Sequence, residues 1–163
     1  MTYYQSSRYR YIVAFLTDMI EFMTDEELLM LEYFGYGNNK NPYGMVRDHK
    51  YSVGNGLANG VFPSIMRHPR NMKLIANNDN GRKGMSNSIS LEDLFEEIID
   101  FNREWPEQEE CINDINRYRN GERCSNDFEK LIEELNDIRN KFFKWKLNKI
   151  ITGRRINHKI SIS

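Results

Sequence analysis

The span from Arg47 to Gly84 constrains the fold most, because its composition suits neither a packed helix nor a plain strand. It holds two of the three histidines of this 163-residue chain, five of its ten glycines, two of its four prolines and six asparagines. Glycine, proline and asparagine are the residues that turns and irregular segments favour. We therefore expect a loop-rich segment that gathers polar side chains in one place.

Two residues of this span, Asp48 and His49, have the chemistry of a hydrolytic site. A carboxylate is a hard oxygen ligand, which suits Mg²⁺. An imidazole with an ordinary pKa of about 6.5 can take a proton from water at pH 7. Adjacent side chains on a strand point to opposite faces, so these two can serve one site only where the strand twists or ends.

A second polar group follows in the sequence HPRNMKLI, which places Asn71 at the start of a short apolar strand. We interpret His68 as a turn residue ahead of a proline. Asn80 comes nine residues after Asn71. If a short helix begins near residue 77, the amide of Asn80 can reach the same metal ion as Asp48, and the nearby Arg82 and Lys83 can contact phosphate.

The order of these motifs is Asp-His, a loop, His-Pro-x-Asn-hydrophobic and then Asn-x-x-Lys-Gly. This pattern resembles the HNH endonucleases, whose catalytic unit is the ββα-metal or His-Me finger. The interval from Asn71 to Asn80 is similar to the one between the middle asparagine and the last metal ligand of that family. The likeness is greatest to the versions of phage genomes and homing endonucleases, and it covers about residues 44–100.

The resemblance implies a site with a single metal ion. His49 would be the general base that activates water, Asp48 and Asn80 would bind one divalent metal, and Asn71 would orient His49 and brace the loop. The expected architecture is two antiparallel strands, around 45–51 and 71–75, joined by a long loop and followed by a short helix. Asparagine as the last ligand favours Mg²⁺ or Mn²⁺ over Zn²⁺. No cysteine pair for a structural zinc is present.

Apolar spacing outside this span predicts helices. Residues 12–23 carry a stripe, and Thr24 with Glu27 forms a capping box for a helix over 25–34. The expected fold class is α+β, mostly helical, with a ββα-metal finger embedded between N-terminal helices and a C-terminal helical region. We divide the chain into a helical bracing segment at 1–40, a nuclease core at 41–88 and helices with a basic tail at 89–163.

Three helices are predicted in the C-terminal segment. The first begins after Ser90 and ends near Trp105, ahead of a proline, and a second covers 107–122. The third is long, starts near residue 125 and ends at Gly153. We expect 154–163 to be a short strand or a loose tail.

Charge is strongly segregated along the chain although the net charge is −1. The segments 1–40, 41–88, 89–138 and 139–163 carry net charges of −3, +5, −11 and +8. This pattern indicates a polyanion partner, unless the acidic and basic blocks pair within the fold. With the resemblance, we expect double-stranded DNA, contacted by Arg47, Lys50, Arg70, Lys73, Arg82, Lys83, Lys141, Lys144, Lys146, Lys149, Arg154, Arg155 and Lys159.

The remaining expectations concern the setting of the protein. Cys111 and Cys124 are too few for a disulfide scaffold, so two reduced thiols are expected. No long apolar run and no signal peptide are apparent, so we expect no membrane partner and a cytoplasmic location, in the host cell if the protein is viral. One nuclease site cuts one strand, so double-strand cleavage would need a second binding event or a homodimer through the long helix.

Two other functions stay open from the sequence. One is a non-catalytic nucleic-acid-binding module on the same scaffold, and the other is a helical interaction protein such as a viral host-modulating factor. Tyr33, Tyr36 and Tyr43 could lie in the core or stack on bases, and we favour the core. Removal of the metal would distinguish these functions, because only a nuclease would lose its activity.

Overall fold

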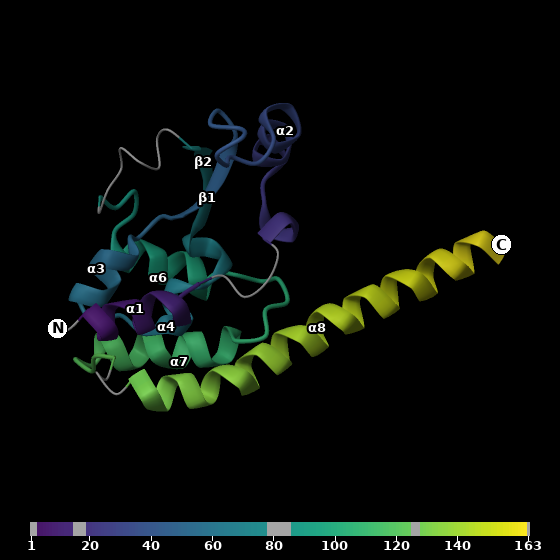
Figure 1. Ribbon diagram of the computed structural model, residues 1–163. Helices are drawn as coiled ribbons and strands as arrows, with labels where there is room; N and C mark the ends of the chain where they lie inside the picture. Colours follow the sequence, from purple (N-terminus) through teal and green to yellow (C-terminus); the bar gives the residue numbers. More distant parts are fainter. Residues whose placement is uncertain (1–2, 15–18, 78–85, 125–127, 163) are drawn as a thin grey trace.

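A computed structural model describes residues 3–14, 19–77, 86–124 and 128–162 (Figure 1). The fold is α+β and mostly helical, with one small two-stranded sheet, as expected. In chain order the elements are α1 (Tyr3–Ile12), η1 (Met19–Phe22), α2 (Asp25–Phe34), β1 (Met45–His49), α3 (Val53–Ala58), α4 (Pro63–Met66), η2 (Pro69–Asn71), β2 (Met72–Ala76), α6 (Leu91–Ile99), α7 (Gln108–Arg119) and α8 (Phe128–Ile162).

The sheet lies where the sequence predicted two strands. β1 and β2 pair antiparallel, with Met45 opposite Ala76 and His49 opposite Met72. Figure 1 shows the sheet and α2 standing on one side of a helical body that holds α1, α3, α4, α6 and α7. The chain therefore leaves β1 toward the body, where α3 is the next element.

The connection between the strands differs from the expected long loop. It contains the helices α3 and α4 and the turn η2, and Val61, Ile65 and Met66 are fully buried. Ser52 caps α3 by accepting a hydrogen bond from the backbone N–H of Asn55, and Pro63 begins α4. Because a proline at the first helical position already has the required backbone angle, it starts a helix even in a glycine-rich setting.

The first hydrophobic core fills the helical body. Its buried side chains come from α1, the strand connection, α6 and α7, and include Tyr9, Ile12, Ile65, Leu94, Phe95, Ile98 and Ile115. The hydroxyl of Tyr9 donates to the carbonyl of Val61 at 2.8 Å, which ties α1 to the strand connection. Ser90 caps α6 as predicted, by accepting from the backbone N–H of Asp93.

The second core joins the sheet to α8. It contains Met45, Met72 and Leu74 of the sheet, together with Met23, Phe101, Trp105, Phe142 and Trp145. The rings of Trp105 and Phe142 meet edge to face at 4.8 Å between centroids. Each core draws side chains from all three of the segments 1–40, 41–88 and 89–163.

Two predicted helices have different bounds in the structure. The helix expected over 12–23 is wrong as one continuous element, because α1 ends at Ile12 and a separate turn, η1, precedes the capping box of α2. Residues 15–18 lie outside the described part of the chain. The helix after Ser90 ends at Ile99, not near Trp105, and the chain that follows carries Phe101 and Trp105 into the second core.

The end of α8 also differs from the prediction. The helix passes through Gly153 and continues to Ile162, so the expected strand or loose tail is wrong. A glycine ends a helix when it adopts a positive φ. Gly35 has such an angle at the end of α2, whereas Gly153 does not. No helix among the described residues has the length and apolar character that a membrane span requires.

The two most distant helices along the chain pack together. α1 contacts α8, where the guanidinium of Arg139 lies 4.9 Å from the ring centre of Tyr11 and donates to its hydroxyl. Beyond this contact, the C-terminal part of α8 extends past the rest of the molecule (Figure 1).

Candidate functional site

Asp48 and His49 are the last two residues of β1. Asp48 lies opposite Lys73 and His49 lies opposite Met72 in the ladder. Opposed residues of an antiparallel pair share a face, and neighbours along a strand do not. The carboxylate therefore lies on the face of Lys73, and the imidazole lies on the face of the second core. Both side chains are half-buried, and Nε2 of His49 is buried.

The chain bends directly after His49, which is the condition under which these neighbours could serve one site. Asn71 braces this bend from within the core, where it is fully buried. Its Oδ1 accepts from the backbone N–H of Tyr51 at 2.8 Å. Its Nδ2 donates to the carbonyls of Tyr51, at 3.3 Å, and of Met66, at 3.0 Å. These three bonds hold the bend in place, and the role of Asn71 in orienting His49 stays a prediction.

The backbone reinforces the same junction. The N–H of Lys50 donates to the carbonyl of Asn71 at 2.8 Å, which extends the pairing of the two strands by one further bond. The N–H of Ser88 donates to the carbonyl of Lys50 at 2.8 Å. The residue after His49 is therefore fixed from two sides, by the start of β2 and by the segment that leads into α6.

Four of the basic residues that we expected to contact DNA surround the sheet. Arg47 is exposed on β1. Lys50, Arg70 and Lys73 line a cavity of about 130 Å³, together with Arg103 and Glu27. Lys50 also forms an ion pair with Glu97 at 3.1 Å, and the guanidinium of Arg70 lies 5.6 Å from the ring centre of Phe101. Positive charge therefore exceeds negative charge beside β2.

The expected second metal ligand, Asn80, and the basic residues Arg82 and Lys83 lie outside the described part of the chain. Within the described ranges, no group of three or more His, Cys, Asp or Glu side chains is arranged to hold a metal ion. Of the proposed ligand pair, the structure thus describes Asp48, whose hard oxygen atoms fit Mg²⁺ or Mn²⁺.

The basic residues predicted on α8 divide into three groups. Lys141 forms an ion pair with Glu110, and Lys149 pairs with Glu21 at 2.7 Å. These two cations are engaged within the fold, as the alternative interpretation of the charge blocks expected. Lys144 and Lys146 are exposed. Arg154, Arg155 and Lys159 belong to α8 by their backbone, and their side chains lie outside the described part.

His68 has a structural role. It is fully buried, with its Nδ1 accepting from the backbone N–H of Arg70 at 3.1 Å and its Nε2 2.8 Å from Oε1 of Gln108. Burial lowers the pKa of the imidazole to about 4, and Gln108 opposes this shift. The ring therefore stays neutral at pH 7, capping η2 ahead of Asn71.

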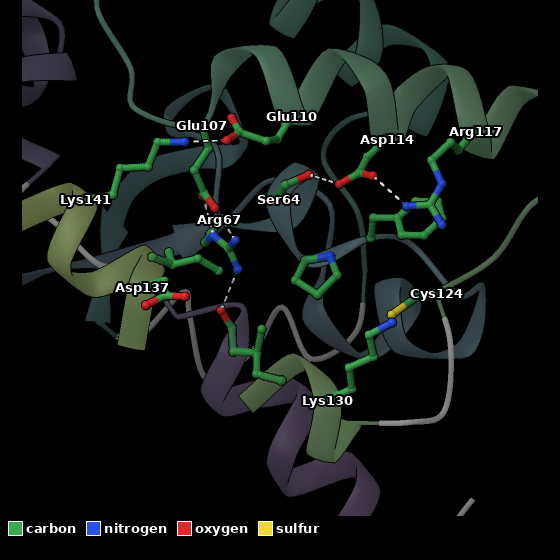
Figure 2. A pocket seen from close by; sticks show the side chains of 14 residues that line it. Ser64, Arg67, Glu107, Glu110, Asp114, Arg117, Cys124, Lys130, Asp137 and Lys141 are labelled. Carbon is green, nitrogen blue, oxygen red and sulfur yellow. Dashed lines mark hydrogen bonds and ion pairs between the residues drawn. The ribbon is translucent and has the colours of Figure 1, made fainter. Parts of the chain in front are cut away.

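A large cavity lies elsewhere, between α4, α7 and α8 (Figure 2). It has a volume of about 680 Å³, and its polar side chains are largely paired with one another. Arg67 and Glu107 form a buried bidentate ion pair, Ser64 donates to Asp114 at 2.7 Å, and Arg117 pairs with Asp114 at 3.0 Å. These groups stabilise the helix packing and leave little charge for a ligand.

Both cysteines are free, as expected. Cys111 is buried, and Cys124 lines the cavity of Figure 2. Burial raises the pKa of the Cys124 thiol to about 11 and that of Cys111 further. Burial therefore favours the protonated thiol of both residues at neutral pH, and the thiolate is the reactive form.

The expectation that Tyr33, Tyr36 and Tyr43 lie in the core is wrong. Tyr33 is 83% exposed and Tyr43 is 75% exposed, and Tyr36 is exposed as well. α2 turns Leu28 and Leu31 toward the second core, so its opposite face remains in solvent. The spacing of apolar residues alone does not reveal which side of a short helix is covered.

Comparisons with protein-family descriptions, with characterised proteins and with solved structures find no match for this chain.

Proposed function

We propose that this chain is a metal-dependent DNA endonuclease of the HNH type, with its site centred on Asp48 and His49. The observation that carries the proposal is the set of three hydrogen bonds by which buried Asn71 braces the bend after His49. Two further observations support it, namely the antiparallel pairing of β1 with β2 and the basic side chains beside the sheet.

The residues have separate tasks in this proposal. His49 would accept a proton from the attacking water, and Asn71 would hold the turn that sets the position of the ring. Asp48 and Asn80 would hold one divalent cation, Mg²⁺ or Mn²⁺. When bound, that cation would stabilise the negative charge that develops on the phosphate.

DNA would approach the basic side of the sheet. Lys73 shares the face of Asp48 in the ladder, and Lys50 and Arg70 lie at its His49 end, whereas Arg47 lies on the opposite face and could contact DNA only from the edge of the sheet. Cations at such positions neutralise phosphates and orient a duplex without reading its sequence. We therefore expect binding that weakens as salt is added.

Conversion of supercoiled plasmid tests the proposal. We expect open-circular or linear DNA in the presence of Mg²⁺ or Mn²⁺ and none with EDTA. His49→Ala should lower the rate by at least about 100-fold, the usual range for loss of a general base. His158→Ala, which removes a histidine from α8, is the matched control and should retain the rate.

The proportions of open-circular and linear product would report on single-strand nicking or paired cutting. A rate that is unchanged in His49→Ala would refute the assignment of the base. If no metal supports conversion but DNA is still shifted on a gel, the chain is a binding module. If DNA is not shifted either, a helical interaction protein is the better description.

A further inference from the structure

Two exposed apolar faces of opposite charge stand out on this molecule. The first, which we call the α2 face, contains Leu29 and Tyr33, 65% and 83% exposed, flanked by Asp25 and Glu32. Leu29 lies four positions from both Asp25 and Tyr33 and three positions from Glu32, so these residues share one side of the helix. α2 contains four acidic residues and no basic residue.

The second face lies on the outer side of α8, and we call it the α8 face. Its exposed apolar residues are Phe143, Leu147, Ile150 and Ile151. Their spacing of three, four and eight places them in one stripe. Lys144 and Lys146 flank the stripe and are exposed. From residue 139 to residue 159, α8 carries eight basic residues and no acidic residue.

The inner side of α8 packs against the second core. Phe142 and Trp145 are buried in the second core, and Lys149 lies 4.4 Å from the ring centre of Trp145. The α8 face therefore consists of residues that the fold leaves uncovered. Leu29, Tyr33 and Phe143 are each at least 65% exposed, so the two faces of one chain do not cover each other.

We propose that the α8 face of one chain binds the α2 face of a second copy of this chain. Leu29 and Tyr33 would be covered by the stripe around Leu147, while Lys144 and Lys146 would meet Asp25 and Glu32. A twofold axis would repeat the contact and close the assembly as a dimer.

Charge favours this arrangement over two alternatives, which are pairing between two α8 faces and binding of DNA by the α8 face. Two α8 faces laid against each other would bring their lysines together, because the helix has no acidic residue from 139 to 159. DNA would account for the lysines but not for four exposed apolar side chains, since phosphate contacts require cations or hydrogen-bond donors. The proposal thus removes Lys144 and Lys146 from the expected DNA contacts.

Sedimentation of the full chain tests the proposal. Across a concentration series we expect a species of twice the 19.5 kDa chain mass. The variant Leu29→Ser/Tyr33→Ser and the variant Phe143→Ser/Leu147→Ser should each weaken association by at least about tenfold. Ile99→Ser, which alters a partly exposed apolar residue of α6 outside both faces, is the matched control and should dimerise normally.

Mixing separates this contact from self-pairing of α8. Each double variant alone should be a monomer, whereas a mixture of the two should form a heterodimer through the one intact pair of faces. Circular dichroism of each variant confirms that the chain is folded. A monomeric wild type, or a Leu29→Ser/Tyr33→Ser variant that dimerises like wild type, would overturn the proposal.

Exchanging two opposite charges across the contact provides a second, independent test. Glu32→Lys and Lys146→Glu should each weaken the dimer, and the two substitutions in one chain should restore it by exchanging the signs across the contact. Restoration supports the pairing of these faces. Additive weakening in the double variant contradicts it. Neither measurement depends on nuclease activity, so the dimer and the enzyme can fail separately.

Discussion

The side-chain amide of Asn71 forms two hydrogen bonds with the backbone of Tyr51, one to its N–H and one to its carbonyl. The amide oxygen of Asn71 accepts from the N–H of Tyr51 at 2.8 Å, and its amide nitrogen donates to the carbonyl of the same residue at 3.3 Å. The Asn71 side chain thus continues the hydrogen-bonding pattern of the sheet beyond its last residue pair, His49 and Met72.

Replacing Asn71 with alanine should lower the free energy of unfolding by about 3 kcal/mol, because buried backbone groups of Tyr51 and Met66 lose their partners. Urea denaturation measures this value. Asn59→Ala is the control, since Asn59 is exposed and donates one bond to the Tyr51 hydroxyl at 2.8 Å. Its effect should stay near 1 kcal/mol. Equal losses in the two variants would argue against a special role for Asn71.

Gly44 and Gly153 should respond in opposite ways to substitution by alanine. A Cβ at Gly44 would lie 2.4 Å from the backbone N of Gly37, whereas at Gly153 nothing lies within 4 Å. We expect Gly44→Ala to destabilise the sheet, by roughly 2 kcal/mol or more. Gly153→Ala should stabilise α8 by about 0.5–1 kcal/mol, because alanine is the better helix former. Thermal denaturation of the two variants checks both signs.

His68 should make stability depend on pH. Its pKa is lowered from 6.5 to about 4 in the folded chain by burial. Between these values the unfolded chain binds more protons, so the free energy of unfolding falls as pH falls from 6.5 to 4 and is fully retained above that window. The loss amounts to roughly 3 kcal/mol at most.

Carboxylates also titrate at the acid end of this window, so a variant is needed to isolate the histidine. His68→Leu should be less stable at neutral pH but should show a shallower slope between pH 6.5 and 4. Denaturant titrations at several pH values measure both slopes. Parallel slopes would mean that His68 does not remain neutral in the folded protein.

The two ion pairs beside the large cavity should differ in their effect on stability. Arg67 and Glu107 are both buried, and Arg67 also donates to the carbonyl of Ile12 at 3.2 Å. Glu107→Gln leaves a buried guanidinium without its counter-charge and should destabilise by about 3–5 kcal/mol. Lys141 and Glu110 are exposed by about half, so Glu110→Gln should change stability by less than about 1 kcal/mol. Unfolding curves of the two variants provide the comparison.

Local signals in the sequence were sufficient to predict several elements. The Thr24 and Glu27 capping box forms in the structure and begins α2, and Ser90 caps α6. The family resemblance, and not a periodic pattern, placed both strands within two residues of their bounds. These features depend on neighbours in the chain, which is why short patterns reveal them.

Features set by distant contacts could not be predicted. The helices α3 and α4 could not be predicted from the glycine-rich span, because their burial depends on contacts with Tyr9, α6 and α7. The exposure of Tyr33 follows from which side of α2 meets the second core. The residue types at Asp48, His49 and Asn71 were recognisable, but the faces on which Asp48 and His49 lie follow from the register with β2.

The contact between α1 and α8 has a consequence for the order of folding during synthesis. α1 occupies residues 3–12 and α8 begins at residue 128, so nearly the whole chain is translated between them. The apolar side of α1, with Tyr9 and Ile12, finds its partners only after residues 61–115 have been made. During synthesis part of the apolar side of α1 therefore stays exposed until α6, α7 and α8 have been made, and correct folding depends on that side not binding elsewhere in the meantime.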